Sequence, residues 1–179
     1  MSTTKKMILT ALFSALIAIG AFIRIPLPVT VFSLQFTFVL LSGMILGANW
    51  GAVSCLLYVL IGLLGFPIFT EGGGFSYIFK PTFGYLFAFI IAAYIVGYFR
   101  EKFGTKSISI LILGCVIAMV VTYLIGTSYT YFILNKVANT PISYKLCLLS
   151  LFPFAVAKDL FSCIIVSIAT PKLIKAVKL

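Results

Sequence analysis

The sequence contains no histidine, and it has only three acidic residues against 13 basic ones. Histidine is the commonest metal ligand and the side chain that most readily moves protons near neutral pH. Its absence argues against a metal site and against a catalytic triad of the usual kind. The chain also lacks the G-x-x-x-x-G-K-[ST] phosphate loop, so it carries no ATPase motif of that type. We therefore expect no catalytic residue, no metal and no cofactor.

Charge of either sign is scarce. Charged residues make up 9% of the 179 positions and hydrophobic residues 63%, and the mean hydropathy is +1.24. A soluble domain of this size could not hide so much apolar surface, because a globule always exposes a large share of itself. Apolar runs of membrane-spanning length recur along the chain. The composition predicts a polytopic membrane protein, with residues 1–179 forming one membrane-embedded domain.

Cysteine is present four times, never in a C-x-x-C pair, and always in or beside an apolar run. These residues are Cys55, Cys115, Cys147 and Cys163. This placement indicates buried free thiols rather than a disulfide framework.

The apolar runs predict an all-α protein with six transmembrane helices. The expected spans are residues 7–23, 33–46, 52–64, 83–99, 108–134 and 146–170. Residues 24–30 and 47–51 are expected to be turns, because proline and glycine interrupt the runs there. Pro171 is expected to end the last span.

The basic residues orient the predicted spans. With both termini cytoplasmic, eight of them fall on the inner side and four on the outer side, a bias typical of membrane proteins. The inner ones are Lys5, Lys6, Arg100, Lys102, Lys106, Lys172, Lys175 and Lys178, and the outer ones are Arg24, Lys80, Lys136 and Lys145. We expect a multi-pass protein of the cell membrane. The basic residues cluster at the ends of the predicted spans, which is typical of membrane orientation. No nucleic-acid partner is therefore expected.

A long segment between the third and fourth spans, G-F-P-I-F-T-E-G-G-G-F-S-Y-I-F-K-P-T-F-G-Y-L at 65–86, differs from an ordinary connector. Three consecutive glycines permit positive φ and close approach of the backbone to a ligand. The segment is long for a connector and rich in aromatic residues, for which a solvated linker has little use. We predict a folded extracellular loop that covers a ligand.

Lys158 and Asp159 stand near the middle of the predicted last span. Each such residue costs roughly 2.5–3.5 kcal/mol at mid-helix, so intramembrane charges usually face a cavity or a partner. Neighbours in a helix diverge by about 100°, and only residues three or four apart share a face. We therefore expect the two not to form a good ion pair by themselves, and predict a ligand site. Satisfaction by other helices, or snorkelling of Lys158, is the structural alternative.

Two further features remain open between a binding and a structural role. Gln35, near the start of the second span, is either a solvated cap or a ligand contact. Hydroxyl side chains between Thr127 and Tyr131 either line a wet cavity or bond their own backbone.

The central segment resembles the biotin-specific S components of energy-coupling factor (ECF) transporters, the BioY family. The resemblance is carried by G-L-L-G-F-P-I-F-T at 62–70, G-G-G-F at 72–75 and P-T-F-G-Y-L at 81–86. The Lys-Asp pair, the length and the six-span layout match as well. The chain departs from the family pattern at Lys80 and Phe83, where that pattern has glycine, which puts the loop contacts in question.

The resemblance implies that the chain binds biotin from outside and works with a transmembrane coupling protein and two ABC ATPases. Lys158 would hold the valerate carboxylate or a ureido oxygen, and Asp159 would accept from a ureido N–H. Tyr85 would stack or hydrogen-bond, and Gly73 and Gly74 would close over the ring. Biotin has a carboxylate, a ureido group and an apolar ring, and these charges and aromatic walls are complementary to them.

The first span carries a stripe of small residues in T-A-L-F-S-A-L-I-A at 10–18. Small residues four apart let another helix approach closely in lipid. The resemblance implies that Ala11 and Ala15 dock onto the coupling protein, whereas spacing alone fits internal packing equally well.

Other functions stay open at this point. An S component for riboflavin or thiamine is one, although cationic thiamine would favour more acidic residues than Glu71 and Asp159. A membrane-embedded enzyme or a structural membrane subunit are others. The lack of histidine and of clustered carboxylates argues against the enzyme, and the presence of Lys158 and Asp159 in mid-span argues against the structural subunit.

Overall fold

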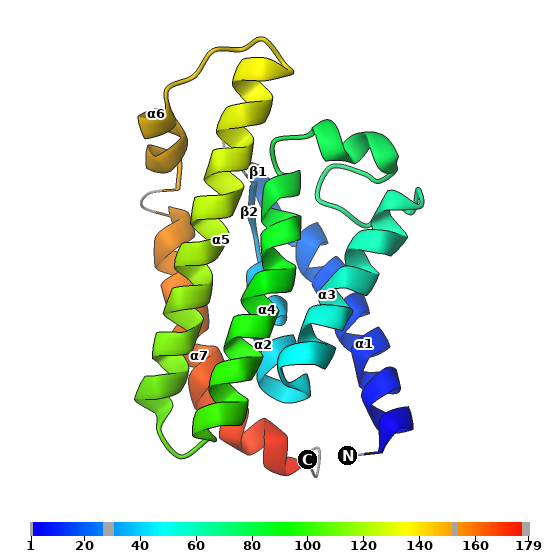
Figure 1. Ribbon diagram of the computed structural model, residues 1–179, viewed down its shortest axis with the longest axis vertical. Helices are drawn as coiled ribbons and strands as arrows, with labels where there is room; N and C mark the ends of the chain where they lie inside the picture. Colours follow the sequence, from blue (N-terminus) through cyan, green and yellow to red (C-terminus); the bar gives the residue numbers. More distant parts are fainter. Residues whose placement is uncertain (1, 27–30, 152–153, 177–179) are drawn as a thin grey trace.

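The computed structural model describes residues 2–26, 31–151 and 154–176, which form a bundle of helices with one short hairpin (Figure 1). In chain order the elements are α1 (Thr3–Phe22), β1 (Arg24–Pro26), β2 (Val31–Ser33), α2 (Gln35–Leu46), α3 (Ala48–Leu63), the 3-10 helix η1 (Phe75–Phe79), α4 (Phe83–Phe103), α5 (Ile108–Lys136), α6 (Tyr144–Leu149) and α7 (Phe154–Ala176). The all-helical prediction holds apart from the two three-residue strands.

Four helices, α1, α4, α5 and α7, are long and apolar enough to cross a membrane. Helices α2 and α3 are apolar but shorter, with 12 and 16 residues. At about 1.5 Å per residue, α2 covers only about 18 Å of a hydrocarbon core of about 30 Å. The six predicted spans thus correspond to four helices of full crossing length and two short ones.

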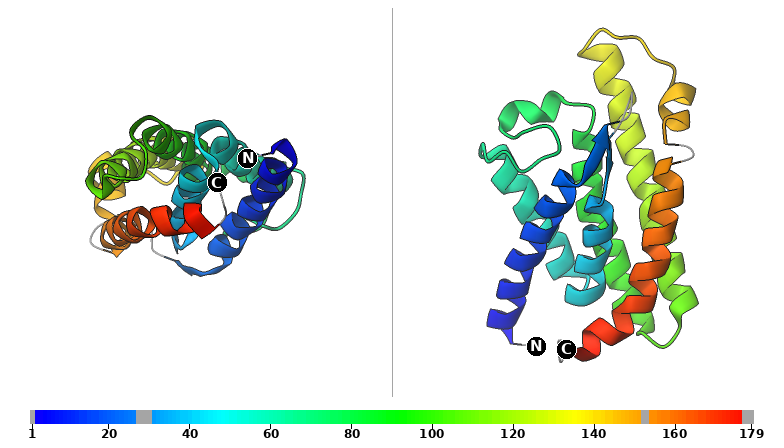
Figure 2. Two further views of the ribbon diagram at one scale, coloured as in Figure 1. Left: turned by 90° about the horizontal axis from the view of Figure 1, so that it is seen from below. Right: turned by 180° about the vertical axis from the view of Figure 1, so that it is seen from behind.

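Helix α2 lies at the centre of the bundle. Helices α4 and α5 stand side by side on one flank and α1 on the other, as the view from below shows (Figure 2). Helix α2 contacts α1, α3, α4 and α7, and its side chains are buried along almost its whole length. Its residues Phe36, Val39 and Leu40 belong to the main apolar core, which extends through α3, α4 and α5.

Small residues bring these helices close together. A Cβ on Gly43 of α2 would lie 2.3 Å from the carbonyl oxygen of Ala93 in α4, and a Cβ on Gly97 would lie 2.3 Å from the nitrogen of Ala48 in α3. Helices α4 and α5 interlock reciprocally, since Gly84 faces the Tyr129 side chain and Gly126 faces Tyr85. Such packing is how helices associate in lipid, where hydrophobic burial between them contributes little.

Two predicted turns are different in the structure. Residues Arg24–Pro26 pair antiparallel with Val31–Ser33, so the first connection is a hairpin whose tip, with Pro28, lies outside the described residues. The second connection is shorter than the turn predicted at residues 47–51, because Gly47 alone, at φ 88°, separates α2 from α3. The residues after it continue as helix, since tertiary packing overrides their local preference for a turn.

The predicted last span is broken. Helix α6 ends at Leu149 and α7 begins at Phe154, so Lys158 and Asp159 lie in the first two turns of α7 rather than at mid-helix. The apolar run concealed this break, although Pro153 in the sequence is a helix-breaking residue. Pro171 does not end α7, which continues to Ala176. Figure 1 shows the end of α7 turning beneath the bundle, where Ile174 packs against Phe13 and Leu46.

The Gly-rich segment lies at the end of the bundle opposite the start of α1 and the end of α7 (Figures 1 and 2). Gly72 and Gly74 have φ values of 114° and 99°, which L-residues other than glycine rarely adopt. Gly74 N donates to Gly62 O at 2.7 Å, which ties the loop to the end of α3. These contacts give the segment between α3 and α4 a defined path across the end of the bundle. All four cysteines are free and buried, as expected.

Candidate functional site

A partly open cavity lies beneath the Gly-rich loop, between α2, α4, α5 and α7. Its volume is about 60 Å³, several times the roughly 10–15 Å³ that one buried water requires. Ser33, Gln35, Phe36, Thr70, Thr82, Tyr85, Leu86, Phe89, Thr122, Tyr123, Leu151, Ala155, Lys158 and Asp159 line it. Apolar walls with a few placed polar groups are typical of small-molecule sites.

The charged pair of α7 forms one wall of this cavity. Lys158 Nζ contacts Asp159 Oδ1, and the two side chains are only 14% and 7% exposed. Lys158 Nζ also donates to Ser33 O at the end of β2, at 2.5 Å. Tyr123 of α5 donates to Asp159 Oδ2 at 2.6 Å. The cluster joins the hairpin, α5 and α7.

Lys158 and Asp159 were expected not to form a good ion pair by themselves, and the structure places them in direct contact with further hydrogen-bond partners for both. Their Cα–Cβ bonds diverge around α7, but the four-carbon stem of lysine is long enough to bring the ammonium back to the neighbouring carboxylate. The pair does not stand alone, since Ser33 and Tyr123 satisfy further donors and acceptors. A buried ion pair needs such additional hydrogen bonds to offset its desolvation.

Two other predicted residues reach the same cavity. Gln35 is 2% exposed, and its side chain lies beside Tyr58. The Tyr58 hydroxyl donates to Ile68 O at 3.1 Å. Gln35 lines the cavity, and its Nε2 has no hydrogen-bond acceptor in good geometry within the described residues. Tyr85 of α4 packs its ring on Gly126 of α5, which fixes where its hydroxyl lies.

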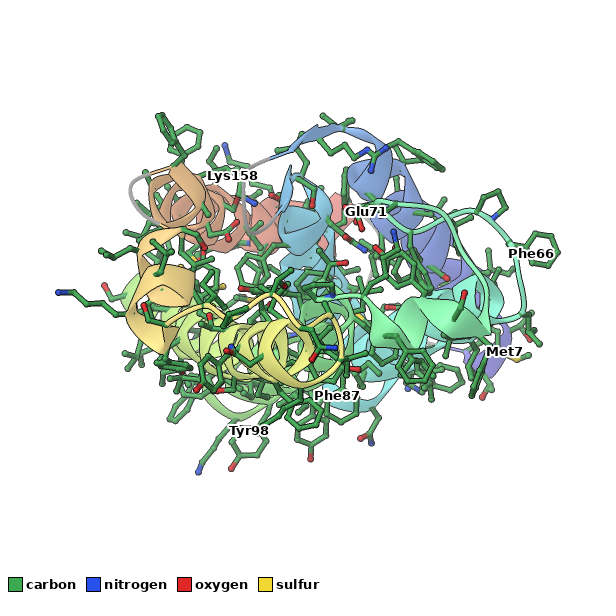
Figure 3. All side chains as sticks on the ribbon, turned by 90° about the horizontal axis from the view of Figure 1, so that it is seen from above. Met7, Phe66, Glu71, Phe87, Tyr98 and Lys158 are labelled. Atoms are coloured by element: carbon green, nitrogen blue, oxygen red, sulfur yellow. The ribbon has the colours of Figure 1, made fainter. Side chains whose placement is uncertain are left out.

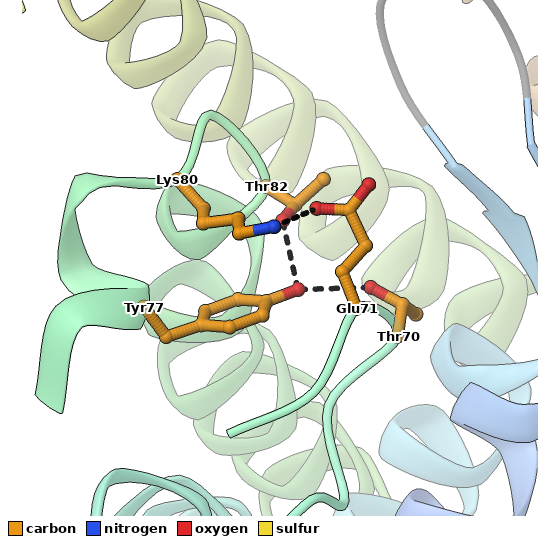
Figure 4. A network of polar contacts seen from close by, with 5 residues as sticks. All are labelled: Thr70, Glu71, Tyr77, Lys80 and Thr82. Carbon is orange, nitrogen blue, oxygen red and sulfur yellow. Dashed lines mark hydrogen bonds and ion pairs between the residues drawn. The ribbon is translucent and has the colours of Figure 1, made fainter. Parts of the chain in front are cut away.

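Gly73 and Gly74 do not line the cavity. A Cβ on Gly73 would lie 2.1 Å from Phe66 O, and Gly74 supplies the positive φ described above. Both glycines are needed for the path of the loop, and other loop residues face the cavity in their place. Thr70 precedes the glycines, Thr82 follows them, and the Tyr77 hydroxyl joins the two (Figure 4).

Several cavity residues were not singled out from the sequence. Tyr123 and Thr122 are polar interruptions of the apolar run 108–125, a signal that could have identified them. The hydroxyl-bearing residues between Thr127 and Tyr131 do not line the cavity. Within it, Tyr129 donates to Ile78 O and Thr130 to Pro81 O, so these side chains hold the loop in place.

Ala11 and Ala15 lie far from this cavity, on the exposed face of α1. Exposed apolar side chains of the same helix surround them, including Met7 and Leu12. Viewed from above, Met7, Phe66, Phe87 and Tyr98 lie at the rim of the molecule (Figure 3). The apolar exterior is the surface expected of a protein embedded in lipid, and internal packing does not use the two alanines.

The fold and the cavity define a multi-pass membrane protein with an internal polar site. A family model described as the BioY family matches residues 1–179, and the chain belongs to that family. The resemblance inferred from the central loop is thereby confirmed.

Named relatives agree with this assignment. The chain is 41% identical over 143 residues to the probable biotin transporter BioY of Lysinibacillus sphaericus, covering 80% of this chain and 73% of that one. It is 31% identical over 180 residues to the biotin transporter BioY2 of Lactococcus lactis subsp. cremoris, covering 98% and 94%. A crystal structure of the S-component for biotin from an ECF-type ABC transporter has the same fold, with a TM-score of 0.73, 24% identity, and coverage of 98% and 95%.

Proposed function

We propose that this chain binds biotin for uptake, as the membrane S component of an ECF-type ABC transporter. The observation that carries the proposal is the buried Lys158–Asp159 pair in a cavity beneath a folded loop, in a chain that belongs to the BioY family throughout its length. A small molecule with a carboxylate, a ureido group and an apolar ring suits that mixture of charges, hydroxyls and aromatic walls.

Within the site, Asp159 would accept from a ureido N–H and Lys158 would bind an oxygen of the ligand, either carboxylate or ureido. Gln35, which lines the cavity, would donate from Nε2 to a second ligand oxygen. Tyr85 would stack on the ring or hydrogen-bond to it. Gly73 and Gly74 would act through the shape of the loop that covers the ligand.

The same proposal includes six crossings of the membrane, with α2 and α3 as short spans. Helix α1 starts and α7 ends at one end of the bundle, and the Gly-rich loop lies at the other (Figure 1), which suits an even number of crossings. The end that carries Lys5, Arg100, Lys106 and Lys172 would be cytoplasmic by the positive-inside rule. Ligand would then enter from outside.

Energy for uptake would come from partners. We infer a transmembrane coupling protein and two ABC ATPases, with the exposed Ala11 and Ala15 of α1 as the docking stripe. Two exposed alanines four residues apart leave a shallow groove in which another helix can pack closely.

Calorimetry on the purified protein tests the function, with biotin, riboflavin and thiamine as separate ligands. We expect saturable binding of biotin at one site and no measurable binding of the other two vitamins. Native mass spectrometry should also find biotin co-purified with the protein. Binding of riboflavin or thiamine in preference to biotin would overturn the proposal.

A further inference from the structure

One hydroxyl group connects the two halves of the Gly-rich loop. Tyr77 lies in η1 and is 2% exposed, and its hydroxyl is 3.0 Å from Thr70 Oγ1 and 3.0 Å from Thr82 Oγ1 (Figure 4). Thr70 and Thr82 line the cavity, whereas Tyr77 does not. Tyr77 therefore hydrogen-bonds to two residues that line the cavity without lining it itself.

The position of the Tyr77 hydroxyl is well determined by its surroundings. The Tyr77 ring packs on Phe69 with ring centroids 4.6 Å apart, and Phe69 in turn packs on Tyr58 of α3. On the other side, Tyr129 of α5 holds the loop backbone at Ile78 O at 2.5 Å. The loop is thus anchored to α3 and α5, and Tyr77 stands between the anchors.

The hydroxyl protons of this triad can be counted. A phenol oxygen has one proton to donate and can also accept. Within the described residues, the two threonines are the hydrogen-bond partners of the Tyr77 hydroxyl. If it accepted from both, its own proton would be left without an acceptor, which is unfavourable for a buried hydroxyl. The favoured arrangement has Tyr77 donating to one threonine and accepting from the other.

In this arrangement the two threonines differ in the hydrogen-bonding capacity that they have left for a ligand. The threonine that accepts from Tyr77 keeps its own proton to donate, and the threonine that donates to Tyr77 has only lone pairs left to offer. Together they present one donor and one acceptor. A carboxylate can only accept, so it would match one of the two, whereas a ureido edge carries an N–H beside a C=O and matches both.

We propose that Tyr77 is a positioning residue that orders Thr70 and Thr82 into a donor–acceptor pair for the ureido edge of the ligand. This inference rests on the proposed function and adds which end of the ligand faces the Gly-rich loop. It also assigns a role to Tyr77, which touches no ligand itself.

The test compares Tyr77→Phe with the wild type for three ligands by calorimetry. Biotin is the reference, 2-iminobiotin replaces the ureido carbonyl by a group that only donates when protonated, and biotinamide changes the other end of the molecule. Tyr77→Phe should weaken biotin binding about threefold to tenfold, the factor of one ordinary hydrogen bond. Preference for biotin over 2-iminobiotin should shrink by about the same factor, and preference for biotin over biotinamide should stay within about twofold.

Tyr129→Phe is the matched control, because it removes a hydroxyl that holds the same loop without touching the triad. Tyr129→Phe should weaken the binding of all three ligands by the same factor. Thr70→Ser and Thr82→Ser should restore the selectivity that Thr70→Val and Thr82→Val lose, which separates the hydroxyl group from packing.

The outcomes distinguish this inference from the proposed function. Wild type that binds biotin, with Tyr77→Phe weakening all three ligands by one common factor, would overturn the positioning role alone. A preference for biotin over biotinamide that collapsed in Tyr77→Phe would place the carboxylate end at the loop and overturn it too. Wild type that bound none of the three ligands would overturn both.

Discussion

At the scale of single residues, the buried charges of α7 dominate the chemistry of the site. The Asp159 carboxylate contacts Lys158 and accepts from Tyr123, so its charge is balanced before any ligand arrives. A ligand N–H that reaches it gains a charge-assisted hydrogen bond, worth roughly 1.5–3 kcal/mol. Removing the charge while keeping the shape of the side chain should therefore weaken ligand binding.

Asp159→Asn should weaken biotin binding about tenfold to a hundredfold, as measured by calorimetry. The substitution also leaves the Lys158 ammonium without its carboxylate, which is destabilising in a buried site, so the melting temperature must be recorded alongside the affinity. The double variant Lys158→Met/Asp159→Asn removes both charges and controls for that effect. Unchanged biotin affinity in both Asp159→Asn and Lys158→Ala would mean that the pair is purely structural.

At the scale of elements, the short α2 ends inside the bundle and its last carbonyls need donors. Arg100 of α4 supplies them, with Nε 2.9 Å from Met44 O and Nη2 3.1 Å from Ile45 O. Next to it, Glu101 Oε1 accepts from Ala48 N at the start of α3, at 3.2 Å. A cation at a helix C-terminus and an anion at an N-terminus both match the helix dipoles.

Arg100→Ala should lower the free energy of unfolding by roughly 1–3 kcal/mol, because two partly buried carbonyls lose their donor. A thermal melt of the detergent-solubilised protein measures the effect as a lower melting temperature. Lys102→Ala is the matched control: it lies two residues away, is exposed, and should change stability by less than about 0.5 kcal/mol. Equal melting temperatures for Arg100→Ala and Lys102→Ala would show that the α2–α3 corner holds without Arg100.

At the scale of the whole molecule, the orientation in the membrane follows from where the two ends of the bundle place their charges. In a variant lacking the four native cysteines, Ser76→Cys on the Gly-rich loop should react with an impermeant thiol reagent added to intact cells. Lys106→Cys, in the connection between α4 and α5 at the opposite end, should react only after lysis. The reverse pattern would invert the proposed topology.

The exterior of α1 supports a second test at this scale. Ala15→Trp should leave biotin binding intact and abolish co-purification with the coupling protein and ATPases, because the indole fills the groove that a partner helix needs. Ala157→Trp, at an exposed position of α7, is the matched control and should leave the complex intact. Loss of biotin binding together with loss of the complex in Ala15→Trp would contradict the docking role.

Composition and local pattern by themselves determined the class of this protein and its helical content, and they singled out the Gly-rich segment. The reason is that each of these depends on average properties: apolar run length for the spans, glycine and aromatic content for the loop, and the distribution of lysine and arginine for the proposed orientation. Lys158 and Asp159 stood out for the same reason, because any charge in an apolar run is conspicuous.

Tertiary structure alone decided which side chains meet. Thr70, Thr82 and Tyr123 share one cavity although they come from the loop and α5, because Gly84 and Gly126 let α4 and α5 interlock and Tyr129 holds the loop above them. The pairing of β1 with β2 and the separation of α6 from α7 were likewise decided by the structure, since apolar run length does not reveal how a backbone continues after a turn. Contacts between distant segments depend on close packing in three dimensions, which no local pattern encodes.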